Sequence, residues 1–154
     1  MKFKTGLLQS VRGMVRFLLV RTAPVFELYA SPINLDPMAP ALPISTDEDY
    51  AAELAKTMGR FYTQGMPEDT KSLQSGVLTT DEFLAQARIA GREFADQFPY
   101  VLSQFRSGLL FYYLGNVDQV SHVMWKVLDP EHPAYDPEVD GKHKDLIEIG
   151  RAHV

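Results

Sequence analysis

Residues 108–122 read GLLFYYLGNVDQVSH and decide the fold that the sequence predicts. Residues 109–114 form an almost unbroken apolar run between Gly108 and Gly115, as expected of a strand buried on both faces of a parallel sheet. A helical spacing of apolar residues resumes at 120–127. A buried strand followed by a short loop and a helix is typical of an α/β fold, in which ligands bind at the carboxyl ends of the strands. The predicted fold class is therefore α/β.

Asp118 and His122 follow this predicted strand and are the leading candidates for a metal site. Residues four positions apart face the same side of a helix, so a carboxylate oxygen and an imidazole nitrogen can reach one cation. Mixed oxygen and nitrogen ligands suit zinc, and manganese or iron nearly as well. On spacing alone the structural alternative is the more frequent one, because Asp is a favoured helix N-cap and a His one turn later can be an ordinary surface or core residue.

The chain before this strand predicts a β-hairpin and an irregular segment. The β-favouring runs 15–20 and 26–30 flank a Thr-Ala-Pro sequence, which indicates two strands joined by a turn. Residues 31–44 contain four prolines, which remove backbone donors and disfavour helix at the residue before each of them. We therefore expect residues 31–44 to be extended and irregular.

Two helices are predicted between this segment and the buried strand. The Ser-Thr-Asp-Glu sequence at 45–48 fits a capping box, and the helical pattern that follows ends at Gly59. A second capping signal at 79–82 precedes an apolar stripe with spacings of three and four through residues 83–105. Pro99 lies inside that stripe and should kink or split the helix. The aromatic residues of the stripe are expected to be core.

A second group of candidate ligands lies after the metal pair, in a loop that also contains three prolines. We expect a solvated loop there rather than a metal cluster, because Asp is common in turns for its local hydrogen bonds. The only tryptophan, Trp125, either packs on its helix or lines a substrate entrance. The candidates in this loop are Asp129, Glu131, His132, Asp136, Asp140 and His143.

Composition excludes several classes of protein. A chain of 154 residues with 45% apolar and 23% charged residues is long and apolar enough for one domain with a core. The net charge of −5 argues against a nucleic-acid-binding surface. The absence of cysteine excludes disulfides and a Cys-ligated zinc site. Arg12 and Arg16 interrupt the apolar stretches of the first twenty residues, so we expect neither an export signal nor a membrane span there.

The stretch LFYYLGNVDQVSHVMWKVLDPEHPAY, residues 110–135, resembles a bacterial group of the alkaline phosphatase superfamily, the type I phosphodiesterase/nucleotide pyrophosphatase-like proteins. The resemblance extends upstream through ELYASPINLDPMAPALPIS and FYTQGMPEDTKSL, so that it covers nearly all of residues 12–140. The Asp-x-x-x-His element with its preceding strand and trailing Trp125 is the specific part of it.

This resemblance implies a largely parallel sheet flanked by helices, with two divalent metal ions, zinc first among them, at the carboxyl edge of the sheet. Asp118 and His122 would bind one metal together with a later His. The other metal would take an early Asp, a Ser or Thr nucleophile and a further Asp-His pair. The substrate would be a small-molecule phosphate ester.

The chain departs from this pattern because it has no convincing match to the nucleophile or to the remaining ligands. It also has no phosphate loop, no Gly-x-Ser-x-Gly and no His-Glu-x-x-His. We therefore expect no catalytic residue within it and interpret residues 1–148 as an internal fragment of one catalytic domain, inactive alone. The alternatives are a non-catalytic binding or interaction domain, or the sulfatase or phosphomutase branch of the same superfamily.

The last six residues, Ile149 to Val154, can be encoded by the sequence of a common sequencing adapter. We expect them to be adapter read-through, a hypothesis that finding these codons in genomic DNA would refute. The substrate, the oligomeric state and the cellular compartment cannot be predicted from the sequence.

Overall fold

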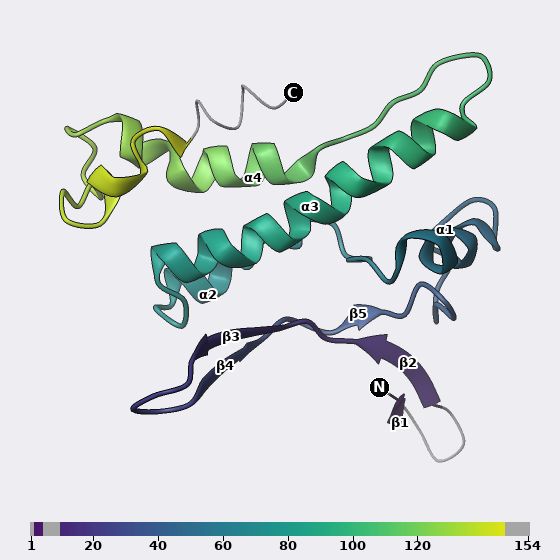
Figure 1. Ribbon diagram of the computed structural model, residues 1–154, viewed down its shortest axis with the longest axis horizontal. Coiled ribbons are helices and arrows are strands. Elements are labelled where there is room, and N and C mark those ends of the chain that lie inside the picture. The colour runs from purple at the N-terminus through teal and green to yellow at the C-terminus, as the bar shows by residue number, and fades with distance from the viewer. Residues whose placement is uncertain (1, 5–9, 147–154) are drawn as a thin grey trace. The chain divides into compact units, whose positions relative to one another are not determined.

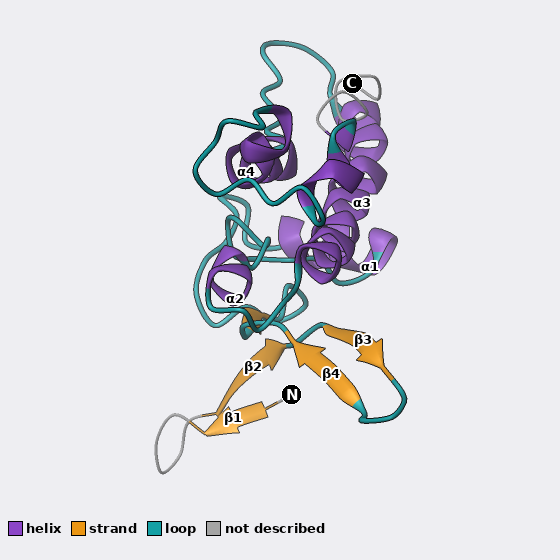
Figure 2. Ribbon diagram, turned by 90° about the vertical axis from the view of Figure 1, so that its left-hand side faces the viewer, coloured by secondary structure: helices purple, strands orange, loops and turns teal. Residues whose placement is uncertain are grey.

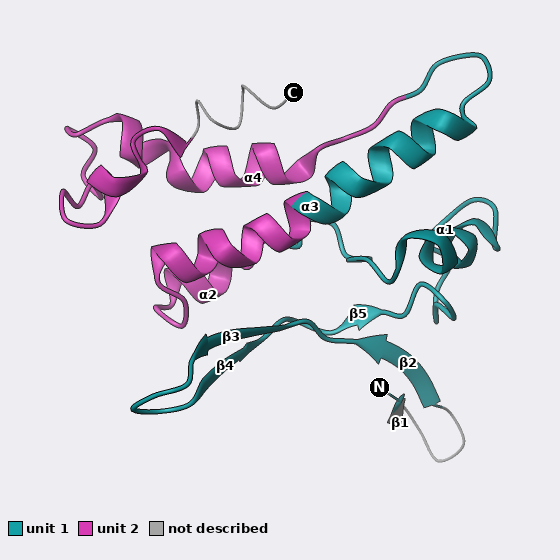
Figure 3. Ribbon diagram, in the orientation of Figure 1, with its two compact units in different colours: residues 1–67, 92–110 teal, residues 68–91, 111–154 magenta. Residues whose placement is uncertain are grey.

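The computed structural model describes residues 2–4 and 10–146 (Figure 1). The chain divides into two compact units (Figure 3). Unit 1 comprises residues 1–67 and 92–110, and unit 2 comprises residues 68–91 and 111–154. Helices and small antiparallel sheets occur together, which confirms the mixed α/β class. The expected adapter-derived residues 149–154 lie outside the described part of the chain.

The strands of unit 1 are short and antiparallel (Figure 2). Strands β1 (Lys2–Lys4), β2 (Ser10–Met14) and β5 (Asn34–Leu35) form one sheet in the order β1-β2-β5. Strands β3 (Phe17–Arg21) and β4 (Glu27–Ala30) form a separate hairpin. The hairpin predicted at 15–20 and 26–30 is therefore confirmed, whereas the predicted parallel sheet is absent from the residues described.

The proline-rich segment is irregular as predicted, apart from β5. Its prolines remove backbone donors, so beyond the β2–β5 pairing it makes only single backbone bonds to the rest of unit 1, such as that from the Asp36 N–H to the Arg12 carbonyl. Buried side chains add further contacts. Asn34 Oδ1 accepts hydrogen bonds from the backbone N–H groups of Thr63 and Gln64 at 3.0 and 3.1 Å. Asp36 forms an ion pair with Arg60 at 3.0 Å. The Arg60 guanidinium and the Met38 backbone N–H lower the pKa of Asp36, outweighing a burial that alone would raise it.

Helix α1 (Tyr50–Met58) begins later than its predicted capping box. The N-cap is Asp49, whose side chain makes no capping hydrogen bond. Ser45 Oγ instead donates to the carbonyl of Asp47, and Asp47 Oδ1 accepts from the backbone N–H of Asp49. The Ser45 hydroxyl, which a capping box would use as an acceptor, thus donates within a local turn, so the predicted cap at 45–48 is wrong. The predicted end of the helix at Gly59, which has φ +85°, is confirmed.

Helix α3 (Thr80–Gln104) begins with the predicted capping box. The Thr79 N–H donates to Glu82 Oε2 at 2.7 Å, and the Glu82 N–H donates to Thr79 Oγ1 at 3.4 Å. The helix continues through Pro99 without a break, so it is not split there. Its apolar stripe is buried at Phe83, Leu84, Ala87 and Ala90, whereas Phe98 near the other end is 39% exposed.

Residues 109–114 do not form the predicted strand. They have no regular secondary structure, and Leu109 and Phe111 are 94% and 82% exposed. A buried strand needs neighbouring strands for its backbone hydrogen bonds and a second layer for its side chains. None of the described strands pairs with this segment, so the predicted burial is wrong for the structure observed.

Unit 2 contains the remaining helices. They are α2 (Thr70–Gln74), the first part of α3, α4 (Gly115–Met124) and two 3₁₀-helices, η1 (Trp125–Leu128) and η2 (Asp140–His143). The side chains of Phe83 and Met124 are fully buried, and Leu78 and Val127 are nearly so. No helix in residues 2–4 and 10–146 is long and apolar enough to cross a membrane.

Candidate metal site

Helix α4 presents Asp118 in its first turn and His122 one turn later. Leu114 is the N-cap, and no side chain caps the helix. Asp118 is therefore not the N-cap of α4, as it would be if its role were only to cap the helix. Both of its carboxylate oxygens contact other side chains, those of Tyr113 and His122.

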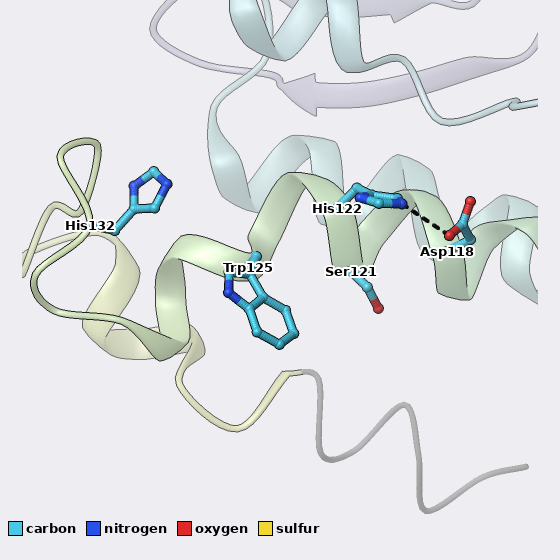
Figure 4. Close-up of a pocket in the computed structure, with 5 residues that line it drawn as sticks. All are labelled: Asp118, Ser121, His122, Trp125 and His132. Carbon is cyan, nitrogen blue, oxygen red and sulfur yellow. Dashed lines mark ion pairs between the residues drawn. The ribbon is translucent and has the colours of Figure 1, made fainter.

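The Asp118–His122 pair has a separation that suits two ligands of one cation. His122 Nε2 lies 3.2 Å from Asp118 Oδ1, and the two side chains point toward one another (Figure 4). Zinc bonds of about 2.0–2.1 Å at a tetrahedral angle would hold two such ligands about 3.3 Å apart. Without a cation the same distance allows a hydrogen bond from the imidazole to the carboxylate. The His122 and Asp118 side chains are 77% and 43% exposed, so solvent reaches the positions that a cation would occupy.

The Tyr113 hydroxyl contacts the other oxygen of the same carboxylate. It donates a hydrogen bond of 2.8 Å to Asp118 Oδ2. This bond to Asp118, followed by the smaller effects of desolvation and of the negative charges of Asp118 and Glu68, raises the pKa of Tyr113. Sequence reasoning missed Tyr113, because a Tyr in an apolar run looks like a packing residue and no spacing rule relates it to a helix residue five positions later.

A shallow hollow of about 560 Å³ adjoins the pair. It is lined by Asp118, Ser121, His122, Trp125 and His132 (Figure 4). Trp125 is 53% exposed and lines this hollow, so it is not a core residue. His132 comes from the loop after η1 and lies away from the Asp118–His122 pair. Its Nδ1 accepts a hydrogen bond from the backbone N–H of Ala134, which is a local turn contact.

The acidic and histidine-containing loop after η1 is partly solvated, as expected. Asp129 and Asp136 each accept a hydrogen bond from the backbone N–H two residues later, the usual turn role of Asp. Asp140 differs, because its side chain is fully buried and forms a 2.8 Å ion pair with Lys126. Burial alone would raise the pKa of Asp140, but Lys126 and the Asp136 N–H stabilise the carboxylate and lower it. The buried ion pair between Asp140 and Lys126 therefore stabilises this part of the loop.

Within residues 2–4 and 10–146, no three His, Asp or Glu side chains converge on a point that could hold a metal. Glu131, His132 and His143 therefore do not join Asp118 and His122, and His143 pairs instead with Asp81 at 3.1 Å. A catalytic zinc takes three protein ligands, and Asp118 and His122 fit two of them in donor chemistry and spacing. Among the described residues, the third ligand of such a site is absent.

Comparisons with models of protein families, with curated proteins and with solved structures found no match to this chain. The metal-site interpretation therefore depends on the geometry of α4 and on the sequence resemblance described above.

Proposed function

We propose that this chain is part of a metal-dependent phosphoester hydrolase in which Asp118 and His122 bind one of two divalent cations, zinc first among them. The observation that carries the proposal is the 3.2 Å separation of His122 Nε2 and Asp118 Oδ1 on an exposed helix face. The two side chains leave the other coordination positions open, and a third protein ligand and the nucleophile would come from chain outside this sequence.

Each side chain has a defined task in this proposal. Asp118 supplies a negatively charged oxygen, and His122 supplies a neutral nitrogen, provided that its imidazole is deprotonated at Nε2. When bound, the cation would supply electrostatic stabilisation to the phosphoryl oxygens of a small-molecule phosphate ester. With one half-site and no nucleophile, the 154-residue chain alone is expected not to hydrolyse phosphate esters.

The same proposal assigns residues 109–114 to a strand of a parallel sheet. Exposure alternates along this segment, with Leu109, Phe111 and Tyr113 more exposed than the residues between them. A period of two is the pattern of a strand. We propose that the segment becomes the buried strand of an alkaline-phosphatase-like parallel sheet whose neighbouring strands lie outside this sequence. In that sheet the loop before α4 would lie at the carboxyl edge, where ligands bind.

Zinc binding tests this proposal. The purified chain is titrated with Zn²⁺ by calorimetry, alongside Asp118→Asn and His122→Gln, with His132→Gln as the matched control. His132 lines the same hollow but lies away from the pair, so its loss should leave zinc binding unchanged. Binding that the first two substitutions abolish supports the proposal. No binding by the unmodified chain, or equal binding by all four proteins, contradicts it.

A non-catalytic interaction domain is the second candidate, and exposed apolar side chains favour it. On the β3–β4 hairpin, Leu19 and Leu28 are a cross-strand pair and are 54% and 47% exposed. Phe17 on the same strand as Leu19 is 58% exposed. Side chains that are grouped in this way are typical of surfaces that another chain or segment covers. This candidate predicts a chain that binds no zinc at Asp118 and His122.

A further inference from the structure

We propose that Tyr113 is a positioning residue for Asp118: its hydroxyl holds Oδ2, so that Oδ1 faces His122 Nε2 in the arrangement that a divalent cation would bind. This inference rests on the proposed function, because it concerns the same pair. It goes beyond that function by adding a residue that would contact no metal.

The two oxygens of the Asp118 carboxylate have different partners, which supports this role of Tyr113. An ionised carboxylate only accepts hydrogen bonds, so the phenol must be the donor in the 2.8 Å bond to Oδ2. Oδ1 lies 3.2 Å from His122 Nε2. Each oxygen therefore has one partner, and rotation of the carboxylate would break the bond to Tyr113. A ligand held in this way would bind a cation through Oδ1 alone.

The position of the Tyr113 ring supports the same role independently of the hydrogen bond. Gly115 is buried at the start of α4, and a Cβ added there would lie 3.1 Å from Tyr113 Cε1 and 3.6 Å from Cδ1. The ring thus lies directly over the glycine, in space that a larger residue would fill. The short connection from Tyr113 through Gly115 to Asp118 is closed by the bond from the Val117 N–H to the Leu114 carbonyl. The hydroxyl is therefore brought to Asp118 by the local fold, although the Tyr113 side chain is 56% exposed.

Outer partners of this kind have a measurable effect on metal sites. They orient the ligand, and removing one typically weakens metal affinity by about 10- to 100-fold. Tyr113→Phe removes a single hydroxyl and keeps the ring over Gly115, so it changes the proposed contact and little else. Tyr50→Phe is the matched control, because Tyr50 is a partly exposed tyrosine of α1 in the other unit, and the substitution removes the same hydroxyl there.

The experiment measures Zn²⁺ affinity and the visible absorption spectrum of the Co²⁺-loaded chain for the unmodified protein and both variants. We expect Tyr113→Phe to bind Zn²⁺ about 10- to 100-fold more weakly and to change the Co²⁺ spectrum, because the carboxylate can then rotate or bind through both oxygens. Tyr50→Phe should match the unmodified protein in both measurements. Tyr113→Phe with an affinity within twofold of the unmodified protein and an unchanged Co²⁺ spectrum would overturn the inference.

A metal-free measurement separates failure of this inference from failure of the proposed function. The nitrogen resonances of the His122 imidazole are recorded by NMR at one pH in the unmodified chain and in Tyr113→Phe. If the unmodified chain binds no zinc, the proposed metal function fails, and these spectra still test whether Tyr113 positions the pair. We expect the His122 resonances to shift when the hydroxyl is removed, and identical spectra would overturn the positioning role.

Discussion

Replacing Lys126 with Met should destabilise unit 2 strongly, because Lys126 neutralises a carboxylate that solvent does not reach. The Asp140 side chain is fully buried, and its Oδ2 lies 2.8 Å from Lys126 Nζ. Removing one partner of a buried ion pair costs about 3–5 kcal/mol, since the other charge stays buried and unpaired. The Lys126 side chain is 25% exposed, so we expect the low end of that range, about 3 kcal/mol. That is a large share of a total stability of about 5–15 kcal/mol.

Urea unfolding followed by tryptophan fluorescence measures this loss. Trp125 is the only tryptophan and precedes Lys126 in η1, so the signal reports on unit 2. Lys142→Met is the matched control, because Lys142 is exposed. The pKa of Asp140 is lowered from its ordinary 3.8, so the stabilisation from the carboxylate is present at neutral pH and is lost as the pH falls through that lowered value. The difference between Lys126→Met and the unmodified chain should therefore shrink in acid. A loss below about 1 kcal/mol at neutral pH, or one that is equal at all pH values, would show that Lys126 does not stabilise unit 2 by neutralising Asp140.

Two further substitutions test other parts of unit 2. Glu68 is 3% exposed, and neither of its carboxylate oxygens has a hydrogen-bond partner among the described residues. This burial raises the pKa of Glu68 above the ordinary 4.5. Burial disfavours the charged carboxylate, so the stability that the protonated form provides is lost as the pH rises through the raised pKa. Glu68→Gln should therefore stabilise the chain by about 1–2 kcal/mol at pH 8 and by less at pH 4. A thermal unfolding series in pH checks this, and destabilisation at pH 8 would contradict it. Thr79→Ala removes the Oγ1 acceptor of the Glu82 N–H, one of the two bonds of the α3 capping box, and should cost about 1 kcal/mol by urea unfolding. An unchanged midpoint would show that this bond contributes nothing.

Local signals predicted the parts of the fold that depend on neighbouring residues. The β3–β4 hairpin followed from two β-favouring runs around a turn, and the start of α3 followed from the Thr79–Glu82 capping box. The end of α1 followed from Gly59, which has a positive φ. In each case the residues that form the structure are adjacent in sequence, so spacing is enough to predict it.

Contacts between distant residues explain what the sequence could not predict. The apolar pattern of residues 109–114 predicted a buried strand, but a strand is stable only when others pair with it, and the pattern does not say whether they exist. The burial of Asp140 could not be predicted either, because it depends on Lys126 in another element.

The candidate site was predictable only in part. Asp118 and His122 followed from the spacing of four residues on one helix face, and the structure brings them within 3.2 Å. The Tyr113 hydroxyl was not predictable, because it reaches Asp118 through the irregular turn at Leu114 and Gly115. His132 was a candidate in sequence and lies at the same hollow, although not at the pair.

Site-resolved NMR of the histidine nitrogens during Zn²⁺ addition shows whether Asp118 and His122 bind zinc, because it identifies the atoms that bind. We expect the His122 Nε2 resonance to shift on zinc addition, the His132 resonances to stay in place, and Asp118→Asn to abolish the His122 shift. A shift at His132 in place of His122, a His122 shift that survives Asp118→Asn, or no shift at all would contradict the claim that Asp118 and His122 bind one cation together.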